Sequence, residues 1–300
     1  MHPRVPFTDS IPRITMATNS SVRAVLITGA TGGIGKAAAI ALADKGFHIY
    51  AGVRTATPEL DVNGITQIRI DVTDTDSIAA AVAAVTKRQD GAGLYALINN
   101  AGVLVQGPVE LVPPAELRRQ FQVNVAGPVQ MIQAFLPLLR EGGGRIINIS
   151  AASARVSPPF LGPIGASKAA LESFSDSLRV ELAPWGIPVS VIQPGAMRTE
   201  IFAKSGAAAQ ESLAQTDPRR VALYERQFVA LDKAMAGQRF APVDVVVGVI
   251  RAAVVARSPK AYYTAGSDAR QAVWLSRLSP RLRDRLVARV LGVSGIQPTR

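Results

Sequence analysis

Thr28-Gly29-Ala30-Thr31-Gly32-Gly33-Ile34-Gly35 is the stretch that decides the fold of this chain. It follows a short apolar run, residues 22–28, and precedes an alanine-rich, helix-prone segment, residues 36–45. Its spaced glycines would permit a tight turn, a close approach to the backbone and close packing of the helix on the sheet. A dinucleotide pyrophosphate needs such bare backbone at a helix N-terminus. The stretch therefore predicts a dinucleotide-binding strand–turn–helix unit.

Short β-branched runs alternate with helical patterns along the rest of the chain. The expected strands are residues 22–28, 47–53, 65–70, 94–99, 145–150, 188–193 and 261–264, and the expected helices are 36–45, 75–88, 121–140, 166–183 and 243–256. Strands separated by helices of this length imply right-handed crossovers and a parallel sheet covered on both faces. We predict a single Rossmann-type, doubly wound α/β domain over residues 21–300, preceded by a mobile N-terminal arm, residues 1–20.

Composition excludes several classes of function. The chain has no cysteine and only two histidines, His2 and His48, so disulfides, thiolate metal sites and histidine clusters are unavailable, and no metal is expected. The N-terminus lacks the apolar stretch of a signal peptide, and no long uncharged apolar run occurs. We therefore expect a cytoplasmic protein.

The net charge of +11 gathers toward the C-terminus. A basic amphipathic helix is expected around residues 277–291, with arginines at Arg277, Arg281, Arg283, Arg285 and Arg289 and apolar residues at Leu282, Leu286, Val287 and Val290. The favoured interpretation is a solvated helix face packed on the domain. Membrane-surface or partner docking is the alternative, and no nucleic-acid partner is expected.

Residues 201–239 depart from the alternating order. This mixed, charged stretch follows a strand at the carboxyl edge, where open α/β sheets bind ligands. It is interpreted as a substrate lid, or equally as an ordinary pair of surface helices.

Five motifs in order carry a family resemblance. They are the glycine stretch already quoted, Asn99-Asn100-Ala101-Gly102, Asn124, Lys168 within Ala166-Ser167-Lys168, and Pro194-Gly195 followed by Thr199. With them, residues 22–265 resemble the short-chain dehydrogenase/reductase family. The sequence of residues 174–179 is similar to that of the steroid, retinol and hydroxybutyrate dehydrogenase branch of this family.

The resemblance implies a nicotinamide cofactor. The acidic residue that selects NAD in the family is replaced by Val53, followed by Arg54, and a guanidinium suits a 2′-phosphate, so NADP(H) is expected. Asp71 and Val72 would contact the adenine, Thr199 the nicotinamide amide and Lys168 the nicotinamide ribose. The implied cofactor residues are Thr28, Gly29, Thr31, Gly33, Ile34, Gly35, Arg54, Asp71, Val72, Asn99, Ala101, Gly102, Lys168, Pro194, Gly195 and Thr199.

The resemblance fails at the proton relay. The family's tyrosine, four residues before the lysine, falls on Ile164, and its serine, thirteen residues earlier, falls on Ala151. Neither side chain can donate a hydrogen bond to a substrate oxygen, so ordinary carbonyl reduction should be crippled. Strand alternation points Ser150 away from Ala151, and no tyrosine lies between Tyr95 and Tyr224. Whether these two residues are natural or were introduced stays open.

Three functions remain. The favoured one is a repurposed non-redox enzyme, performing a cyclisation, isomerisation or pericyclic step on a hydrophobic molecule beside bound NADP(H). The alternatives are an atypical NADPH-dependent oxidoreductase, with water, Lys168 or the substrate as proton source, and an inert NADP(H)-binding module. The catalytic candidates are Asn124 and Lys168, and the substrate pocket would include Ala151, Ile164 and, unless they are solvated loop residues, Ser153 and Arg155. By likeness, a homodimer or homotetramer is expected.

Overall fold

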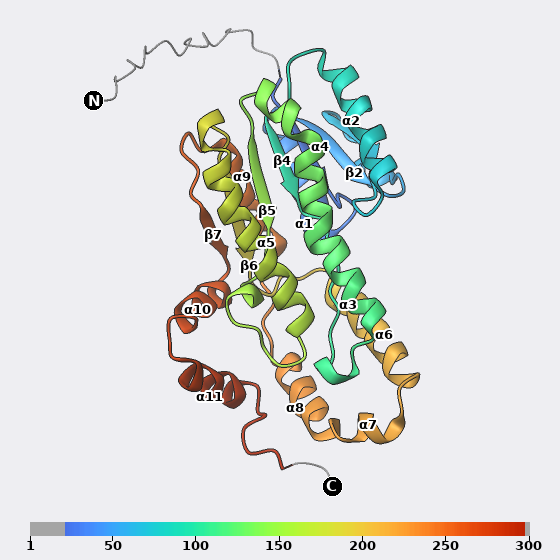
Figure 1. Ribbon diagram of the computed structural model, residues 1–300, viewed down its shortest axis with the longest axis vertical. Coiled ribbons are helices and arrows are strands. Elements are labelled where there is room, and N and C mark those ends of the chain that lie inside the picture. Colours follow the sequence, from blue (N-terminus) through green and yellow to red (C-terminus); the bar gives the residue numbers. More distant parts are fainter. Residues whose placement is uncertain (1–21, 298–300) are drawn as a thin grey trace, which may run out of the picture.

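One parallel sheet of seven strands, in the order β3-β2-β1-β4-β5-β6-β7, runs through the molecule (Figure 1). The computed structural model describes residues 22–297, so the arm predicted for residues 1–20 lies outside the described residues. The strands are β1 (Ala24–Thr28), β2 (His48–Val53), β3 (Ile65–Arg69), β4 (Ala96–Asn99), β5 (Arg145–Ile149), β6 (Val189–Pro194) and β7 (Tyr262–Ala265). The chain winds outward from β1 to β3, then returns to place β4 on the other side of β1. This reversal opens a crevice at the carboxyl ends of β1 and β4, where ligands bind in such sheets.

Helices cover both faces of the sheet, as predicted. The covering helices are α1 (Gly33–Ala43) and α9 (Val243–Val255) on one face, and α2 (Thr75–Gln89) and α4 (Gly127–Glu141) on the other, with α5 (Gly162–Glu181) beside β5 and β6. Because side chains alternate along a strand, Val25 and Ile27 of β1 pack in the first core and Leu26 packs in the second. The fold is the doubly wound α/β domain that the sequence indicated.

The helix predicted over residues 121–140 is not one regular helix. It consists of the end of α3 (Pro114–Phe121), a π-helical turn (Gln122–Ala126) and α4. The prediction missed the turn because one extra residue in a helical turn leaves the apolar periodicity almost unchanged. Such turns occur mostly at functional sites, and this one carries Asn124.

The segment after β6 forms three helices that extend beyond the carboxyl ends of the strands (Figure 1). They are α6 (Ile201–Ala214), α7 (Pro218–Ala222) and α8 (Glu225–Ala236), and neither α7 nor α8 has a buried side chain. Their place beside the crevice suits a lid, which stays a prediction.

Two more helices, α10 (Ser267–Leu275) and α11 (Pro280–Val290), follow β7. No side chain of α11 is buried, so the packing on the domain that the sequence favoured is limited to partly exposed contacts. Single 3₁₀ turns occur at Pro58–Leu60, Val109–Leu111, Ala152–Ala154 and Ala183–Trp185. Within residues 22–297, none of the helices combines the length and apolar character needed to cross a bilayer.

Candidate active site

The glycine turn lies where β1 ends and α1 begins. Gly29 has a φ of +65°, and a Cβ there would lie 2.8 Å from the Cα of Ala101. A Cβ on Gly35 would overlap the carbonyl oxygen of Gly29, so the helix starts directly against the turn. No side chain caps the N-terminus of α1, and its first turn holds no acidic residue. The free N–H groups there form a site that favours an anion such as a phosphate.

Polar side chains behind the turn hold its shape. The Thr28 hydroxyl accepts hydrogen bonds from the backbone N–H groups of Asn100 and Ala101, each 3.0 Å long. The Asn100 amide donates to the carbonyl oxygens of Thr28 (3.0 Å) and Gly29 (3.1 Å). Thr28, expected to contact the cofactor, is thus buried and engaged in joining the ends of β1 and β4. Asn100 was quoted in a motif but not chosen as a site residue, although it fixes the turn.

The expected adenosine end lies at the ends of β2 and β3. Arg54 is exposed just after β2, and it forms no ion pair with any described residue. The pKa of Asp71 is lowered by hydrogen bonds from the hydroxyl and N–H of Thr73 and by the positive charge of Arg54. Val72 packs in the core against Gly127, so only its backbone is free for the contact expected with adenine.

Asn99 turns into the core. Its amide nitrogen donates to Asn148 at 2.9 Å, and the Asn148 amide donates to the hydroxyl of Ser175, also at 2.9 Å. Asn99 thereby ties β4 to β5 and α5 instead of facing the crevice. This agrees with a stabilising position behind the expected nicotinamide half.

Lys168 stands at the centre of the site. Its ammonium donates a 2.7 Å hydrogen bond to the carbonyl oxygen of Ile149, and its side chain is 6% exposed. A Cβ on Gly102 would lie 3.6 Å from the Nζ of Lys168 and 3.4 Å from the Oδ1 of Asn124. Burial lowers the pKa of Lys168 to about 8, although Glu172, one helical turn further along α5, opposes this. At neutral pH the ammonium is mostly protonated, yet close to its titration range.

Asn124 shapes the site without offering a free group. Its amide accepts from the N–H of Val103 (2.9 Å) and donates to the carbonyl oxygen of Val103 (2.9 Å). Gln120 binds the same segment: its amide accepts from the N–H of Val105 (2.6 Å) and donates to the carbonyl oxygen of Val103 (2.8 Å). Both ends of the Asn124 amide are thus engaged by Val103, and its expected role as a polar handle for substrate stays a prediction. Gln120 was missed, because a lone glutamine in a helix carries no local signal.

The two altered positions lie on the elements that meet at Lys168, Ala151 two residues after Ile149 and Ile164 one helical turn before Lys168 on α5. Ile164 begins α5 and is 6% exposed, and Ala151 follows β5 and is half-buried. The hydroxyl of Ser150 is buried and donates to Glu172 at 2.7 Å, so it is already engaged within the chain. Each of the five tyrosine hydroxyls is hydrogen-bonded elsewhere: Tyr50 to Gln89, Tyr95 to Val254, Tyr224 to Glu110, Tyr262 to Asp176 and Tyr263 to Lys260. No tyrosine replaces the missing relay.

Arg155 is held by contacts with two other elements. Its guanidinium pairs with the buried carboxylate of Glu172 at 3.2 Å and lies over the ring of Tyr262 at 4.7 Å. The other oxygen of Glu172 accepts from Ser150 and, at 2.8 Å, from Gln193. The sequence did not indicate this ion pair, because Arg155 and Glu172 come together only in the folded chain, and a contact of Arg155 with substrate stays a prediction. The backbone oxygen of Ser153 accepts from Ser157, and a role for its hydroxyl stays a prediction.

The Pro194-Gly195 turn closes the crevice from the far side. The N–H of Ala196 donates to Asp268 at 2.6 Å, and a Cβ on Gly195 would overlap the carboxylate of Asp268. Further along the turn, Thr199 lies against the glycine turn, with its methyl carbon 2.8 Å from a Cβ placed on Gly33. The structure therefore places Thr199 against the glycine turn that is predicted to bind the cofactor. Asp268, the brace of this turn, was missed.

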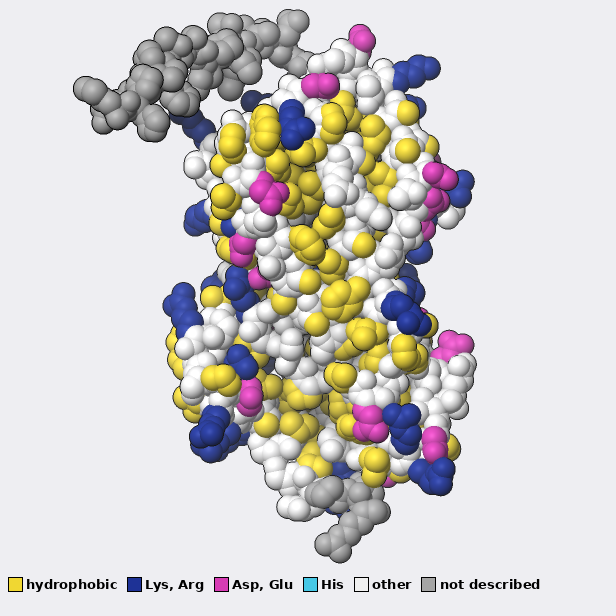
Figure 2. All heavy atoms as spheres, viewed as in Figure 1, with side chains coloured by type: hydrophobic (Ala, Val, Ile, Leu, Met, Phe, Trp, Pro, Cys, Tyr) yellow, Lys and Arg dark blue, Asp and Glu magenta, His cyan; other side chains and the backbone are white. Residues whose placement is uncertain are grey.

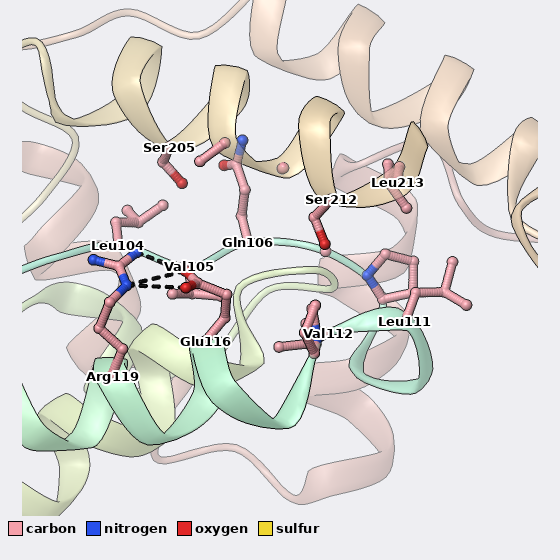
Figure 3. Close-up of a pocket in the computed structure, with 15 residues that line it drawn as sticks. Leu104, Val105, Gln106, Leu111, Val112, Glu116, Arg119, Ser205, Ser212 and Leu213 are labelled. Carbon is pink, nitrogen blue, oxygen red and sulfur yellow. Dashed lines mark hydrogen bonds and ion pairs between the residues drawn. The ribbon is translucent and has the colours of Figure 1, made fainter. Parts of the chain in front are cut away.

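A pocket opens between α3 and α6 (Figure 3). It is a small pocket, partly open to solvent, and its walls are mostly apolar. The ion pair of Glu116 and Arg119 (2.6 Å) lies on one side, and the buried hydroxyl of Ser205, which has no hydrogen-bond partner, lies on the other. The pocket adjoins residues 103–106, the segment that Asn124 and Gln120 hold in place.

Comparison with known proteins agrees with this geometry. The family model described as "short chain dehydrogenase" matches residues 23–210. A 3-amino-tetrahydro-pyrrolizinone reductase of Xenorhabdus hominickii is 33% identical over 83% of this chain and 88% of its own length. An NADPH-dependent 3-dehydrocapnine reductase of Ornithobacterium rhinotracheale is 35% identical over 81% of this chain and 87% of its own. A short chain dehydrogenase from Burkholderia cenocepacia, solved in complex with NADP, superposes with a TM-score of 0.69 at 26% identity, over 90% of this chain and 98% of its own.

Proposed function

This chain belongs to the short-chain dehydrogenase/reductase family, and on that premise we propose that it binds NADP(H) and catalyses hydride transfer to or from a hydrophobic small molecule. The relatives named above are reductases, and one of them is NADPH-dependent by name. Hydride transfer therefore has support from the names of these relatives. The non-redox step that the sequence favoured has no such support.

The residues present fit the cofactor. The uncapped N-terminus of α1 suits the pyrophosphate, and the glycine turn leaves bare backbone for its approach. Arg54, unpaired among the described residues and next to Asp71, suits the 2′-phosphate that distinguishes NADP(H). Lys168 would hold the nicotinamide ribose hydroxyls. When bound, NADPH supplies the hydride equivalent, and the protein must supply the proton.

The single observation that carries the proton step is the buried ammonium of Lys168. Its pKa of about 8 makes it a better proton donor than an ordinary tyrosine hydroxyl, whose pKa is about 10. Ile164 and Ala151 contribute no hydroxyl, so Nζ of Lys168 donates the proton to the substrate oxygen directly or through one water molecule. Lys168 lies further from the expected substrate oxygen than the family's tyrosine would, so it is a less effective donor. The rate of ketone reduction should therefore be about 10²- to 10⁴-fold below that of a chain with serine and tyrosine at positions 151 and 164.

The test compares the chain as it stands with the double variant Ala151→Ser, Ile164→Tyr. NADPH oxidation is followed with a panel of hydrophobic ketones, and NADPH binding is measured separately by fluorescence. We expect slow turnover by the unmodified chain, about 10²- to 10⁴-fold faster turnover by the double variant, and equal NADPH binding. NADPH binding without oxidation by either protein would contradict the proposed hydride transfer.

A second candidate function is the non-redox cyclisation or isomerisation. It is favoured by the apolar character of Ala151 and Ile164, the two positions nearest the expected reacting centre. An apolar pocket can accelerate a reaction by holding a reactive conformer, without an acid. In that case substrate would be converted while bound NADP(H) stays unconsumed, and restoring serine and tyrosine would not increase the rate. An unmodified chain that already oxidises NADPH as fast as the double variant would exclude this candidate.

A further inference from the structure

Helix α11 presents two parallel stripes to solvent. Residues four apart share a helix face, and Arg281, Arg285 and Arg289 form one such row. Leu282, Leu286 and Val290 form the adjacent row. All three arginines are exposed, and Leu282 and Val290 are 46% and 80% exposed. The outward side of α11 is therefore both cationic and apolar.

The surroundings of α11 extend this character. Residues 277–297 hold five arginines and a single acidic residue, Asp284, which pairs with Arg283. Trp274, at the end of α10, is 59% exposed. In Figure 2, basic and apolar side chains lie side by side over the region where Figure 1 places α11. We call α11 together with Trp274 the C-terminal face.

We propose that the C-terminal face docks on an anionic lipid bilayer. Arginines attract anionic headgroups, and the leucine–valine row and the indole ring can enter the boundary between headgroups and acyl chains. A nucleic acid or an acidic protein surface would match the arginines but would leave the apolar row in water. The two rows together therefore favour lipid over other polyanions.

Docking in this way would bring the lid to the bilayer. The segment that follows α11 touches α8, where a guanidinium nitrogen of Arg226 donates to the carbonyl oxygen of Gln297 at 3.4 Å. The face and the lid lie at the same end of the molecule (Figure 1).

The experiment is co-sedimentation of the full chain with vesicles of phosphatidylcholine, alone or with added phosphatidylglycerol. We expect binding only when phosphatidylglycerol is present. Each arginine near an anionic surface contributes about fivefold in partition coefficient, so Arg281→Gln, Arg285→Gln, Arg289→Gln should weaken binding about 100-fold. Lys87→Gln, Arg88→Gln, Arg118→Gln removes the same charge from exposed positions on α2 and α3 and should leave binding nearly unchanged.

A second variant tests the apolar row. Leu282→Ser, Val290→Ser keeps every charge and should weaken vesicle binding severalfold, while leaving any binding to duplex DNA unchanged. Circular dichroism confirms that each variant is folded. The proposal is overturned if the unmodified chain ignores anionic vesicles, or if the control triple variant loses as much binding as the α11 variant. It is also overturned if the serine variant binds vesicles as well as the unmodified chain, because the face would then be a general polyanion site.

Discussion

At the residue scale, the site combines the buried Lys168 with two apolar residues, Ala151 and Ile164, at the positions where the resemblance implies hydroxyl groups. In the family that this chain resembles, the ammonium acts through the tyrosine, and here Ile164 leaves it without that partner. Lys168 instead donates to the carbonyl oxygen of Ile149 in a buried setting. Burial makes its charged form less favourable, and so it makes the ammonium a readier proton donor.

The pH dependence of ketone reduction tests this role. Because the protonated ammonium is the acid, kcat/KM should be level below about pH 8 and fall tenfold per unit above it. In the oxidation direction the sign reverses, since the neutral amine is then the base, and the rate should rise with pH up to about 8. Both pH dependences can be measured by following the rate of NADPH oxidation and the rate of NADP⁺ reduction as a function of pH.

Lys168→Arg is the matched control for charge. Its guanidinium keeps a positive charge next to the ribose but does not titrate near pH 8, so the break in the profile should disappear. Lys168→Met should lose both the break and most of the activity. If Lys168→Met retained the break near pH 8, another group would be the acid.

At the scale of elements, loops at the carboxyl ends of the strands are braced by side chains that arrive from elsewhere. Glu172 of α5 gathers Ser150, Gln193 and Arg155, and so joins α5 to β5, β6 and the loop after β5. Asp268, at the start of α10, holds the turn after β6 through the N–H of Ala196. The crevice is thus shaped by contacts between elements, because each loop alone lacks enough partners to fix its conformation.

The brace at Gly195 allows a direct test. Gly195→Ala places a methyl group on the carboxylate of Asp268, and overpacking of this kind should lower the free energy of unfolding by about 1–3 kcal/mol. Asp268→Ala leaves the N–H of Ala196 without its acceptor and should cost about 1 kcal/mol. The double variant should lose less than the sum, because the clash disappears with the carboxylate. Urea unfolding of the unmodified chain, the two single variants and the double variant gives a double-mutant cycle for the free energy of unfolding. Strictly additive losses would show that the two residues are not in contact.

At the scale of the whole molecule, helix α5 presents a second surface that no other part of the described residues covers. On α5 the exposed residues Ala166, Ala169, Ser173 and Ser177 share a face of small side chains, and the exposed Phe174 lies at its edge. Phe174 is 47% exposed. A flat face of this kind suits an isologous contact with a second copy, and we propose that the chain forms a homodimer through α5.

Light scattering coupled to gel filtration tests the dimer. The unmodified chain should have twice the mass of one chain, and Phe174→Glu should halve it by placing a charge in the contact. Val255→Glu, at an exposed site on α9, is the matched control and should leave the mass unchanged. A monomeric unmodified chain would remove the proposal.

The sequence by itself determined the order of the strands and of most helices that cover the sheet, the position of the glycine turn, and the presence of Ala151 and Ile164 where the resemblance implies serine and tyrosine. These follow from local periodicity, from glycine's freedom at Gly29 and from counting back from Lys168, none of which needs distant contacts. Only the tertiary structure decided that Arg155 pairs with Glu172, that Asp268 braces Gly195 and that Lys168 is buried enough to lower its pKa. Each of these depends on side chains from different elements meeting in space, and burial and electrostatic effects arise only after the chain has packed.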